Sequence, residues 1–217
     1  MFNKIRIKLK RVFYFLMFLI VLSSCNSDIK PIAFETAAID NEFEADINVF
    51  YDEAIGNSAL SKAINKEIKT AIINTLDYSK TPDDFNSLLE DFNSEFVSFK
   101  KDFPEATEPV WELNIETEVA YQSDAMITIS INTYDFRGGA HGNDKITFLN
   151  LDATTGQALN QSDLIKNTKE FKALAERYLL QTLETEGKDL KMDDLFFGKP
   201  FELPENIGLS DDGLVLL

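Results

Sequence analysis

The chain has 217 residues, of which 44% are hydrophobic and 27% are charged, and its formal net charge is −16. This mixture is typical of a globular protein, because it is too apolar to remain disordered and too charged for a bundle of membrane-spanning helices. One cysteine and one histidine exclude a disulfide scaffold and a zinc site built from clustered cysteine or histidine ligands. The negative charge argues against a nucleic acid partner, which is itself a polyanion.

The first 24 residues show the three parts of a bacterial lipoprotein signal peptide in the right order. Five basic residues and no acidic residue occur within residues 1–11, and the apolar run of residues 12–22 is too short to span a membrane. Two serines then precede Cys25, an arrangement that resembles the lipobox, in which the cysteine is acylated and the chain is cleaved before it. We therefore expect residues 1–24 to be removed and residues 25–34 to form a tether with palmitate-type lipid on Cys25.

This anchor determines the expected location of the mature chain. The five basic residues leave with the peptide while all 37 acidic residues remain, so the lipid, rather than attraction to anionic headgroups, must hold the protein at the membrane. We expect a lipoprotein of the cell envelope that faces the periplasm or the exterior, and Asn26 after the cysteine favours the outer membrane. An ordinary signal peptide followed by an incidental cysteine is the alternative.

Periodicity predicts a strand and two helices in the first half of the mature chain. Residues 44–51 alternate between apolar and polar side chains, as in a strand, and residues 58–76 follow helical spacing. Thr81 before Pro82 has the pattern of an N-cap and predicts the start of a second helix. The apolar stripe of this helix runs from position 85 to position 103 and contains five phenylalanines. We interpret the stripe as part of the core rather than as a ligand groove.

The central part of the chain changes to the two-residue period of strands. Residues 111–121 and 127–132 alternate between apolar and polar side chains, which predicts a long antiparallel hairpin. A further strand at residues 145–151, a turn after it, and a helix at residues 168–185 follow. The expected fold class is therefore α+β, an antiparallel sheet with a long hairpin packed against two to three amphipathic helices. A chain of this length buries a sizeable core without a metal or a disulfide.

The loop between two of these strands holds the only histidine and three glycines within five residues. Glycine permits positive φ and close approach of the backbone, so the loop can present N–H groups to an oxyanion, a phosphate or a glycan oxygen. His141 belongs to the residue type that titrates near neutral pH. The alternative is a glycine-rich corner in which His141 satisfies buried backbone groups. The candidate binding residues of this loop are Arg137, Gly138, Gly139, His141, Gly142 and Asn143.

The run Tyr-Asp-Phe-Arg-Gly-Gly-Ala-His-Gly at residues 134–142 resembles the signature of a pair of linked bacterial envelope domains. This pair occurs in the ectodomains of RsiV-type anti-sigma factors and in the non-catalytic part of PdaC-type peptidoglycan deacetylases. Residues 151–159 and 206–214 resemble later segments of the same pair. The resemblance implies an N-terminal PdaC/RsiV-like α+β domain at residues 35–140 and a C-terminal RsiV-like domain at residues 141–217.

The resemblance also carries expectations about completeness and function. Family members continue with a further loop and strand beyond the point that corresponds to Leu217, so we expect the second domain to be truncated, with one sheet edge unpaired. In the anti-sigma ectodomains the pair recognises lysozyme, and in the deacetylases a separate domain performs the chemistry. The resemblance therefore implies a non-catalytic binding or sensing module for a lysozyme-like protein or for peptidoglycan, with no cofactor and no metal.

The residue types alone leave two other functions as alternatives. An envelope hydrolase would have to use His141 with Asp135 or Asp144, as a general base or as a metal site, although the sequence has no His-Glu-x-x-His or Gly-x-Ser-x-Gly pattern. A structural envelope lipoprotein would make contact through the polar face of the predicted hairpin. That face carries Glu112, Asn114, Glu116 and Glu118, which are also compatible with an ordinary solvated surface.

Overall fold

We analysed the protein in a computed structural model, which describes residues 31–39, 42–76, 84–105, 109–185 and 192–217. The expected signal peptide, and with it Cys25, lies outside the described residues. Within the described ranges, none of the helices is both long enough and apolar enough to cross a membrane.

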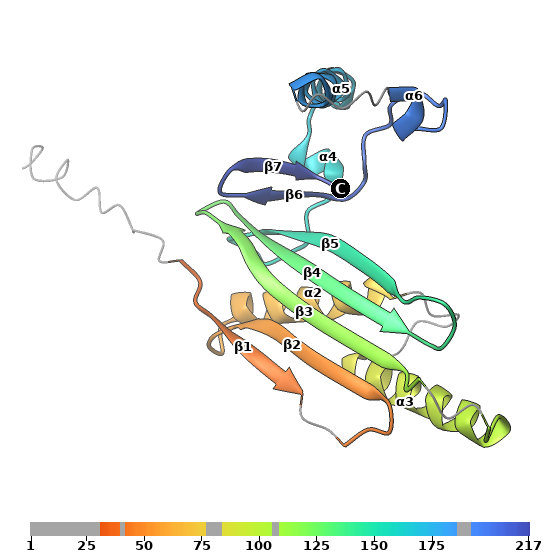
Figure 1. Ribbon diagram of the computed structural model, residues 1–217. Helices are drawn as coiled ribbons and strands as arrows, with labels where there is room; N and C mark the ends of the chain where they lie inside the picture. The colour runs from red at the N-terminus through yellow and green to blue at the C-terminus, as the bar shows by residue number, and fades with distance from the viewer. Residues whose placement is uncertain (1–30, 40–41, 77–83, 106–108, 186–191) are drawn as a thin grey trace, which may run out of the picture. The chain divides into compact units, whose positions relative to one another are not determined.

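A five-stranded sheet forms the centre of the fold (Figure 1). Its strands follow the order β1-β2-β3-β4-β5, so β1 and β5 are the edge strands. The expected α+β class is confirmed, and the expected hairpin is the antiparallel pair β3–β4. The strands are β1 (Phe34–Ile39), β2 (Asp46–Ala54), β3 (Glu112–Gln122), β4 (Met126–Phe136) and β5 (Asn143–Asp152).

Two features of this sheet differ from the expectation. First, β2 and β3 are parallel, because helices α2 (Ala59–Thr75) and α3 (Phe85–Asp102) lie between them and return the chain to the same end of the sheet. Second, β1 begins at Phe34, the last residue of the expected tether, and continues through residues 35–39, where no strand was predicted. Residues 34–39 show little alternation, and they form a strand because they pair antiparallel with the outer edge of β2. The expected domain boundary after residue 140 falls in the loop between β4 and β5, which pair with each other in this sheet.

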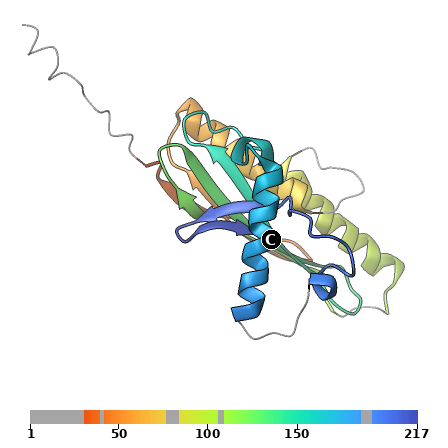
Figure 2. The ribbon, with the colours of Figure 1, turned by 90° about the horizontal axis from the view of Figure 1, so that it is seen from above.

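Helices α2 and α3 pack on one face of the sheet and enclose the core (Figure 2). Both helices begin with a side-chain cap, in which the Ser61 N–H donates to Ser58 Oγ at 3.0 Å and the Ser87 N–H donates to Asp84 Oδ1 at 2.8 Å. The expected cap, Thr81, lies outside the described residues, and the helix starts three residues later because Asp84 caps it directly before the first apolar side chain. The fully buried core includes Ile64, Ile68, Ile72, Leu88, Phe92, Leu113, Ile115, Ile127, Ile129 and Ile131.

The phenylalanine stripe of α3 is part of this core, as predicted, except at its last position. Phe85, Phe92 and Phe96 are buried, and Phe99 packs against the cluster from a half-buried position. Phe103, which follows the last residue of the helix, is 58% exposed.

The turn after β5 confirms the pattern that predicted it. The carboxylate of Asp152 accepts hydrogen bonds from the Thr154 hydroxyl at 2.6 Å and from the backbone N–H groups of Thr154 and Thr155, both at 2.8 Å. These bonds, the Thr154 hydroxyl first, lower the pKa of Asp152 to about 2. The chain then forms α4 (Gln161–Leu164), α5 (Thr168–Thr185) and α6 (Met192–Leu195). Helix α5 has the predicted bounds and buries Ala175 and Leu183.

A second, two-stranded sheet covers one end of the face opposite α2 and α3 (Figure 2). It consists of β6 (Ile207–Ser210) and β7 (Gly213–Leu216). The Asn150 side-chain amide donates to the carbonyl of Ile207 at 2.7 Å, and the Thr128 hydroxyl donates to Asn150 Oδ1 at 2.8 Å. Gly208 lies directly on the Phe148 ring, where a Cβ atom would come within 2.3 Å of the ring. Together these contacts attach the hairpin to the sheet.

Candidate functional site

The loop that the sequence singled out is fastened to helix α3 through Arg137. Its guanidinium forms an ion pair with Glu95, and its Nε atom lies 3.6 Å from Asp135 Oδ2. The same group lies 5.0 Å from the centre of the Phe92 ring. A guanidinium between two carboxylates and above an aromatic ring is positioned to hold the loop in place. The geometry therefore assigns Arg137 a structural role in addition to any contact with a ligand.

The three glycines of the loop are required for two different reasons. Gly138 and Gly139 have φ angles of 81° and 115°, which residues with a side chain rarely adopt. Gly142 lies against the ring of Tyr134, and a Cβ atom there would come within 2.5 Å of the ring. The glycine pattern thus forms a tight corner over Tyr134, which accounts for the motif without a ligand.

His141 is exposed, and its Nδ1 atom lies 3.1 Å from the carbonyl oxygen of Gly142. It does not satisfy a buried backbone group, so that interpretation of the histidine is wrong. Asn143 is exposed at the start of β5, opposite Asp135 in the sheet register. In the part of the chain that the structure describes, no three histidine, cysteine or acidic side chains are grouped so that they could hold a metal ion.

The uncovered part of the five-stranded sheet places polar and acidic side chains of four strands side by side. We call this surface the open face and define it by Asp46, Asn48, Phe50, Glu112, Asn114, Glu116, Asn132, Tyr134, Asp144 and Ile146. The register aligns Asn48, Asn114, Tyr134 and Asp144 in one row across β2 to β5. The next row contains Phe50, Glu116, Asn132 and Ile146.

A hollow of about 440 Å³ lies in the open face between β3, β4 and β5. Glu116 and Asp144 line it, and within the described ranges neither carboxylate forms an ion pair. The amides beside it are oriented, because Asn48 Nδ2 donates to Asn114 Oδ1 at 3.0 Å and to Asp46 Oδ1 at 2.9 Å. The apolar side chains of Phe50 and Ile146 are 48% and 50% exposed on the same surface. The open face therefore combines unpaired negative charge, oriented amides and exposed apolar surface.

Sequence reasoning found only part of this surface. Alternation along the predicted hairpin identified the polar side chains of β3, including Asn114 and Glu116. Asn48 and Ile146 were missed, and Asp144 was considered only as a partner of His141, because the place of these residues beside β3 and β4 depends on the strand order. Polar alternation within residues 44–51 and 145–151 was the available signal, but it does not say which strands are neighbours.

Comparison with known proteins identifies the domain that carries this surface. Residues 37–144 match the family model described as deacetylase PdaC. Residues 37–144 form a PdaC-type domain. The match contains β2, α2, α3, β3, β4 and the whole glycine-rich loop, so the resemblance predicted from residues 134–142 is confirmed. No curated protein matches the chain.

Two solved structures share the fold over most of the chain. A DUF3298 family protein from Pseudomonas aeruginosa PAO1 has a TM-score of 0.63 and 19% identity, and the alignment covers 86% of this chain and 82% of that chain. A DUF3298 family member from Bacteroides fragilis NCTC 9343 has a TM-score of 0.60 and 20% identity, with coverage of 85% and 83%. The shared fold thus extends beyond the PdaC-type domain.

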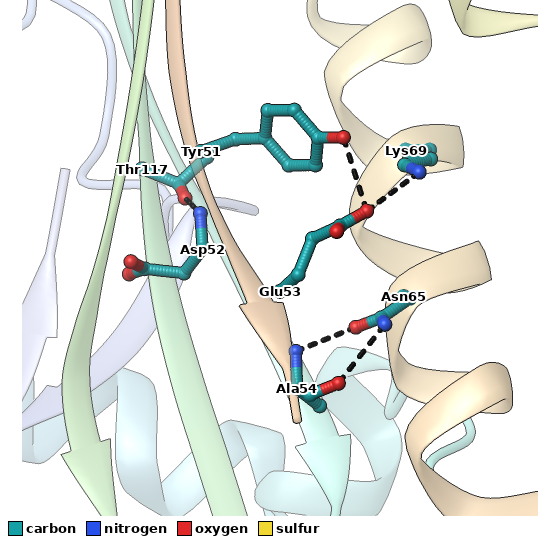
Figure 3. Close-up of polar contacts among 7 residues, drawn as sticks. All are labelled: Tyr51, Asp52, Glu53, Ala54, Asn65, Lys69 and Thr117. Carbon is teal, nitrogen blue, oxygen red and sulfur yellow. Dashed lines mark hydrogen bonds and ion pairs between the residues drawn. The ribbon is translucent and has the colours of Figure 1, made fainter. Parts of the chain in front are cut away.

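The PdaC-type domain has a second polar cluster on the helix side of β2 (Figure 3). Lys69 Nζ lies 2.7 Å from Glu53 Oε1, and the Tyr51 hydroxyl donates to the same oxygen at 3.0 Å. The hydrogen bond from Lys69 lowers the pKa of Glu53, against the opposing effect of burial. Burial opposes the charge of Lys69, but the bonds to Glu53 and Tyr51 outweigh it and raise the pKa of Lys69. Burial raises the pKa of Tyr51.

This cluster connects β2 to α2. Asn65 of the same helix caps the end of β2, accepting from the Ala54 N–H at 2.7 Å and donating to the Ala54 carbonyl at 3.1 Å. Asp52 lies on the other side of the strand, where its backbone N–H donates to Thr117 Oγ1 at 2.7 Å (Figure 3). Burial raises the pKa of Asp52.

Replacing Lys69 with glutamine is expected to lower the stability at pH 7 by about 0.5–1 kcal/mol, a small value because the pair is partly exposed. The lowered pKa of Glu53 contributes stability that is present above its ordinary pKa of 4.5 and is lost as the pH falls through the lowered value. Denaturant unfolding should therefore show the difference between wild type and Lys69→Gln shrinking below pH 4.5. Lys66→Gln, on the exposed side of α2, is the control and should show no such dependence.

Proposed function

We propose that the protein is a lipid-anchored module of the cell envelope, tethered through Cys25, that binds a basic protein of the lysozyme type or a cell-wall ligand without catalysing a reaction. The observation that supports this function best is the open face, an uncovered surface of the sheet. It carries exposed apolar side chains, and its carboxylates form no ion pair with any residue that the structure describes. The anchor would place this surface outside the cytoplasm, at the outer membrane or the cell surface.

The chemistry of the open face favours a cationic ligand. Glu116 and Asp144 line the hollow without a cationic partner of their own within the described ranges, so a ligand amine or guanidinium would neutralise them. The excess of acidic residues, which grows when the five basic residues leave with the signal peptide, would steer a basic protein toward the surface and would make association sensitive to salt. Phe50 and Ile146 supply apolar contact area, as the centre of a protein interface usually does. Asn114 and Asn132 supply the donors and acceptors that a glycan would need.

Calorimetry with residues 26–217 tests this proposal, with hen lysozyme and soluble peptidoglycan fragments as titrants at low and moderate salt. We expect saturable binding of lysozyme that weakens with salt. The double variant Glu116→Gln with Asp144→Asn should weaken it by about tenfold, since two charge contacts of about 0.7 kcal/mol each are lost. The matched control, Glu90→Gln with Asp91→Asn, removes the same charge from exposed positions of α3 and should change affinity little.

The titrations also separate the ligand classes. Binding of wall fragments alone, lost in the same double variant, would assign the open face to a glycan. If a cooperatively folded protein binds neither titrant, or if both double variants lose binding equally, the open face is not the binding surface and the proposal fails.

A further inference from the structure

The outer edge of β5 presents backbone N–H and C=O groups. Among the residues that the structure describes, other parts of the chain bond to these groups only from the carbonyl of Ile146 to the C-terminal end of the strand. β5 is the last strand of the five-stranded sheet, so β4 pairs with one of its edges, and none of the strands that the structure describes pairs with the other. In an antiparallel pair, the N–H and C=O groups of every second residue point away from the partner strand. In β5 the outward-pointing groups belong to the even-numbered residues. The backbone groups that bond to partners outside the five-stranded sheet include those of Ile146, Phe148 and Asn150.

The C-terminal half of this edge is already paired. The Asp152 N–H donates to the carbonyl of Gln157 at 2.9 Å, and the carbonyl of Asn150 accepts from the Leu159 N–H at 2.8 Å. Further along, Asn206 Oδ1 accepts from the Phe148 N–H at 2.8 Å, and its Nδ2 donates to the carbonyl of Ile146 at 2.7 Å.

The side chain of Asn206 therefore stands in for one peptide group of a neighbouring strand. Its amide offers the same acceptor and donor as a backbone peptide, and it bridges the carbonyl of Ile146 and the N–H of Phe148, as a parallel strand would. This contact shows that the β5 edge is accessible to a strand-like partner at Ile146. Beside Ile146, the part of the chain that the structure describes supplies this one step.

The N-terminal half of the edge is open. Residues 143–146 are all exposed, and the outward N–H of Ile146 and both outward groups of Asp144 have no partner among the residues that the structure describes. Edge strands are commonly guarded by a lysine that projects over the edge. Here the Lys145 ammonium instead donates to the carbonyl of Thr75 on α2 at 2.9 Å. It is held against the helix and leaves the outward groups of β5 accessible.

Hollows lie on both sides of this half of the strand. The hollow of the open face, of about 440 Å³, is on one side. A second of about 440 Å³ borders Thr75 and Asn143, and a third of about 370 Å³ borders Asn74 and Asn206. Successive side chains of an added strand point to opposite faces, so they would enter hollows on either side. A side chain that enters the open-face hollow from this edge would meet Asp144, which lies on β5 itself.

From these contacts we infer that an extended segment of a partner protein pairs with the outer edge of β5 beside Asp144 and Ile146, with a basic side chain directed to Asp144. This inference rests on the proposed function in taking the ligand to be a protein. It adds the mode of recognition, in which backbone hydrogen bonds hold the segment and the acidic hollow selects its side chain. The neighbouring Asn206 amide would continue the row of bonds along the strand.

The test uses a variant that removes one outward N–H and no bond of the fold. Ile146→Pro deletes the N–H that has no partner, and proline is tolerated at such positions of edge strands. Ile146→Ala is the matched control, because it loses the same exposed side chain and keeps the N–H. A phage-displayed library of random peptides is selected on the wild-type chain after depletion on Ile146→Pro. One enriched peptide is then synthesised in normal and in alternately N-methylated form.

We expect the enriched peptides to alternate basic and β-branched residues and to shift the amide resonances of residues 142–148 on saturable binding. Affinity should fall about tenfold or more in Ile146→Pro and stay within about twofold in Ile146→Ala. N-methylation should abolish binding to the wild-type chain, a result that does not depend on the folding of any variant. The inference would be overturned if no peptide is enriched on the wild-type chain after depletion on Ile146→Pro. It would also be overturned if the N-methylated peptide binds the wild-type chain as tightly as the normal peptide.

The two proposals can fail separately. If lysozyme binds wild type and Ile146→Pro equally while no peptide is enriched, the proposed function stands and pairing at the β5 edge is excluded. If a peptide binds the edge but neither lysozyme nor wall fragments bind, the edge inference stands and those two ligands are excluded.

Discussion

Replacing Phe92 with alanine is expected to lower the free energy of unfolding by about 3–5 kcal/mol, a large share of the about 5–15 kcal/mol of a typical domain. Phe92 is fully buried between α3 and the sheet, with its ring 5.9 Å from the Trp111 ring at an interplanar angle of 63°. The substitution leaves a cavity where the helix meets the sheet, and it also removes the ring beneath the guanidinium of Arg137. We therefore expect the Gly138–Asn143 loop to loosen as well.

Denaturant unfolding measures the first effect, and amide resonances of the loop measure the second. Phe103→Ala is the matched control, because it makes the same substitution at the end of the same helix, where the ring is 58% exposed. It should cost less than about 1 kcal/mol. Equal losses in the two variants would mean that α3 does not seal the core in the way its buried stripe indicates.

Replacing Cys25 with serine in the full-length chain is expected to move the protein from the membrane fraction to the soluble envelope fraction. The reason is chemical, because serine has no thiol to carry the lipid, and the acidic mature chain has no other attraction to an anionic membrane. Fractionation after expression in a bacterial host, with labelled palmitate, measures both location and acylation. Ser27→Ala is the control and should remain labelled and membrane-bound.

The outcome also decides between the two interpretations of the N-terminus. An ordinary signal peptide predicts that wild type and Cys25→Ser are equally soluble and equally unlabelled. A wild-type chain that stays in the membrane fraction without label would point to an uncleaved helix instead. Either result would remove the tether from the proposed function and would leave the open face as a binding surface to be tested by itself.

The elements that the sequence predicted well are those whose signals are local. Helix α5 has the predicted bounds, and α2 differs from the prediction by one residue at each end, because spacing along a helix is independent of what it packs against. The turn after β5 was evident because the Asp152 side chain bonds to residues two and three positions later. The run Gly-Gly-Ala-His-Gly likewise identified the PdaC-type domain from contiguous residues.

The candidate site was predicted only in part, because its residues come from strands that are distant in the sequence. The glycine-rich loop was singled out for its composition, yet its glycines serve a tight corner over Tyr134. Arg137 was taken for a ligand group, and the structure shows it bound to Glu95 of α3, 42 residues away in the chain. No local pattern indicates a contact of that range.

By itself, the sequence determined the fold class, the main helices, the central hairpin and the family, and it predicts the lipid anchor at Cys25. These follow from periodicity, capping and short motifs, which depend on neighbouring residues alone. Only the tertiary structure decided that β2 runs parallel to β3, that Asn48, Asn114, Tyr134 and Asp144 share a row, and that Asn206 pairs with the edge of β5. Strand order and register arise from packing between distant segments, and the binding surface exists only after that packing is complete.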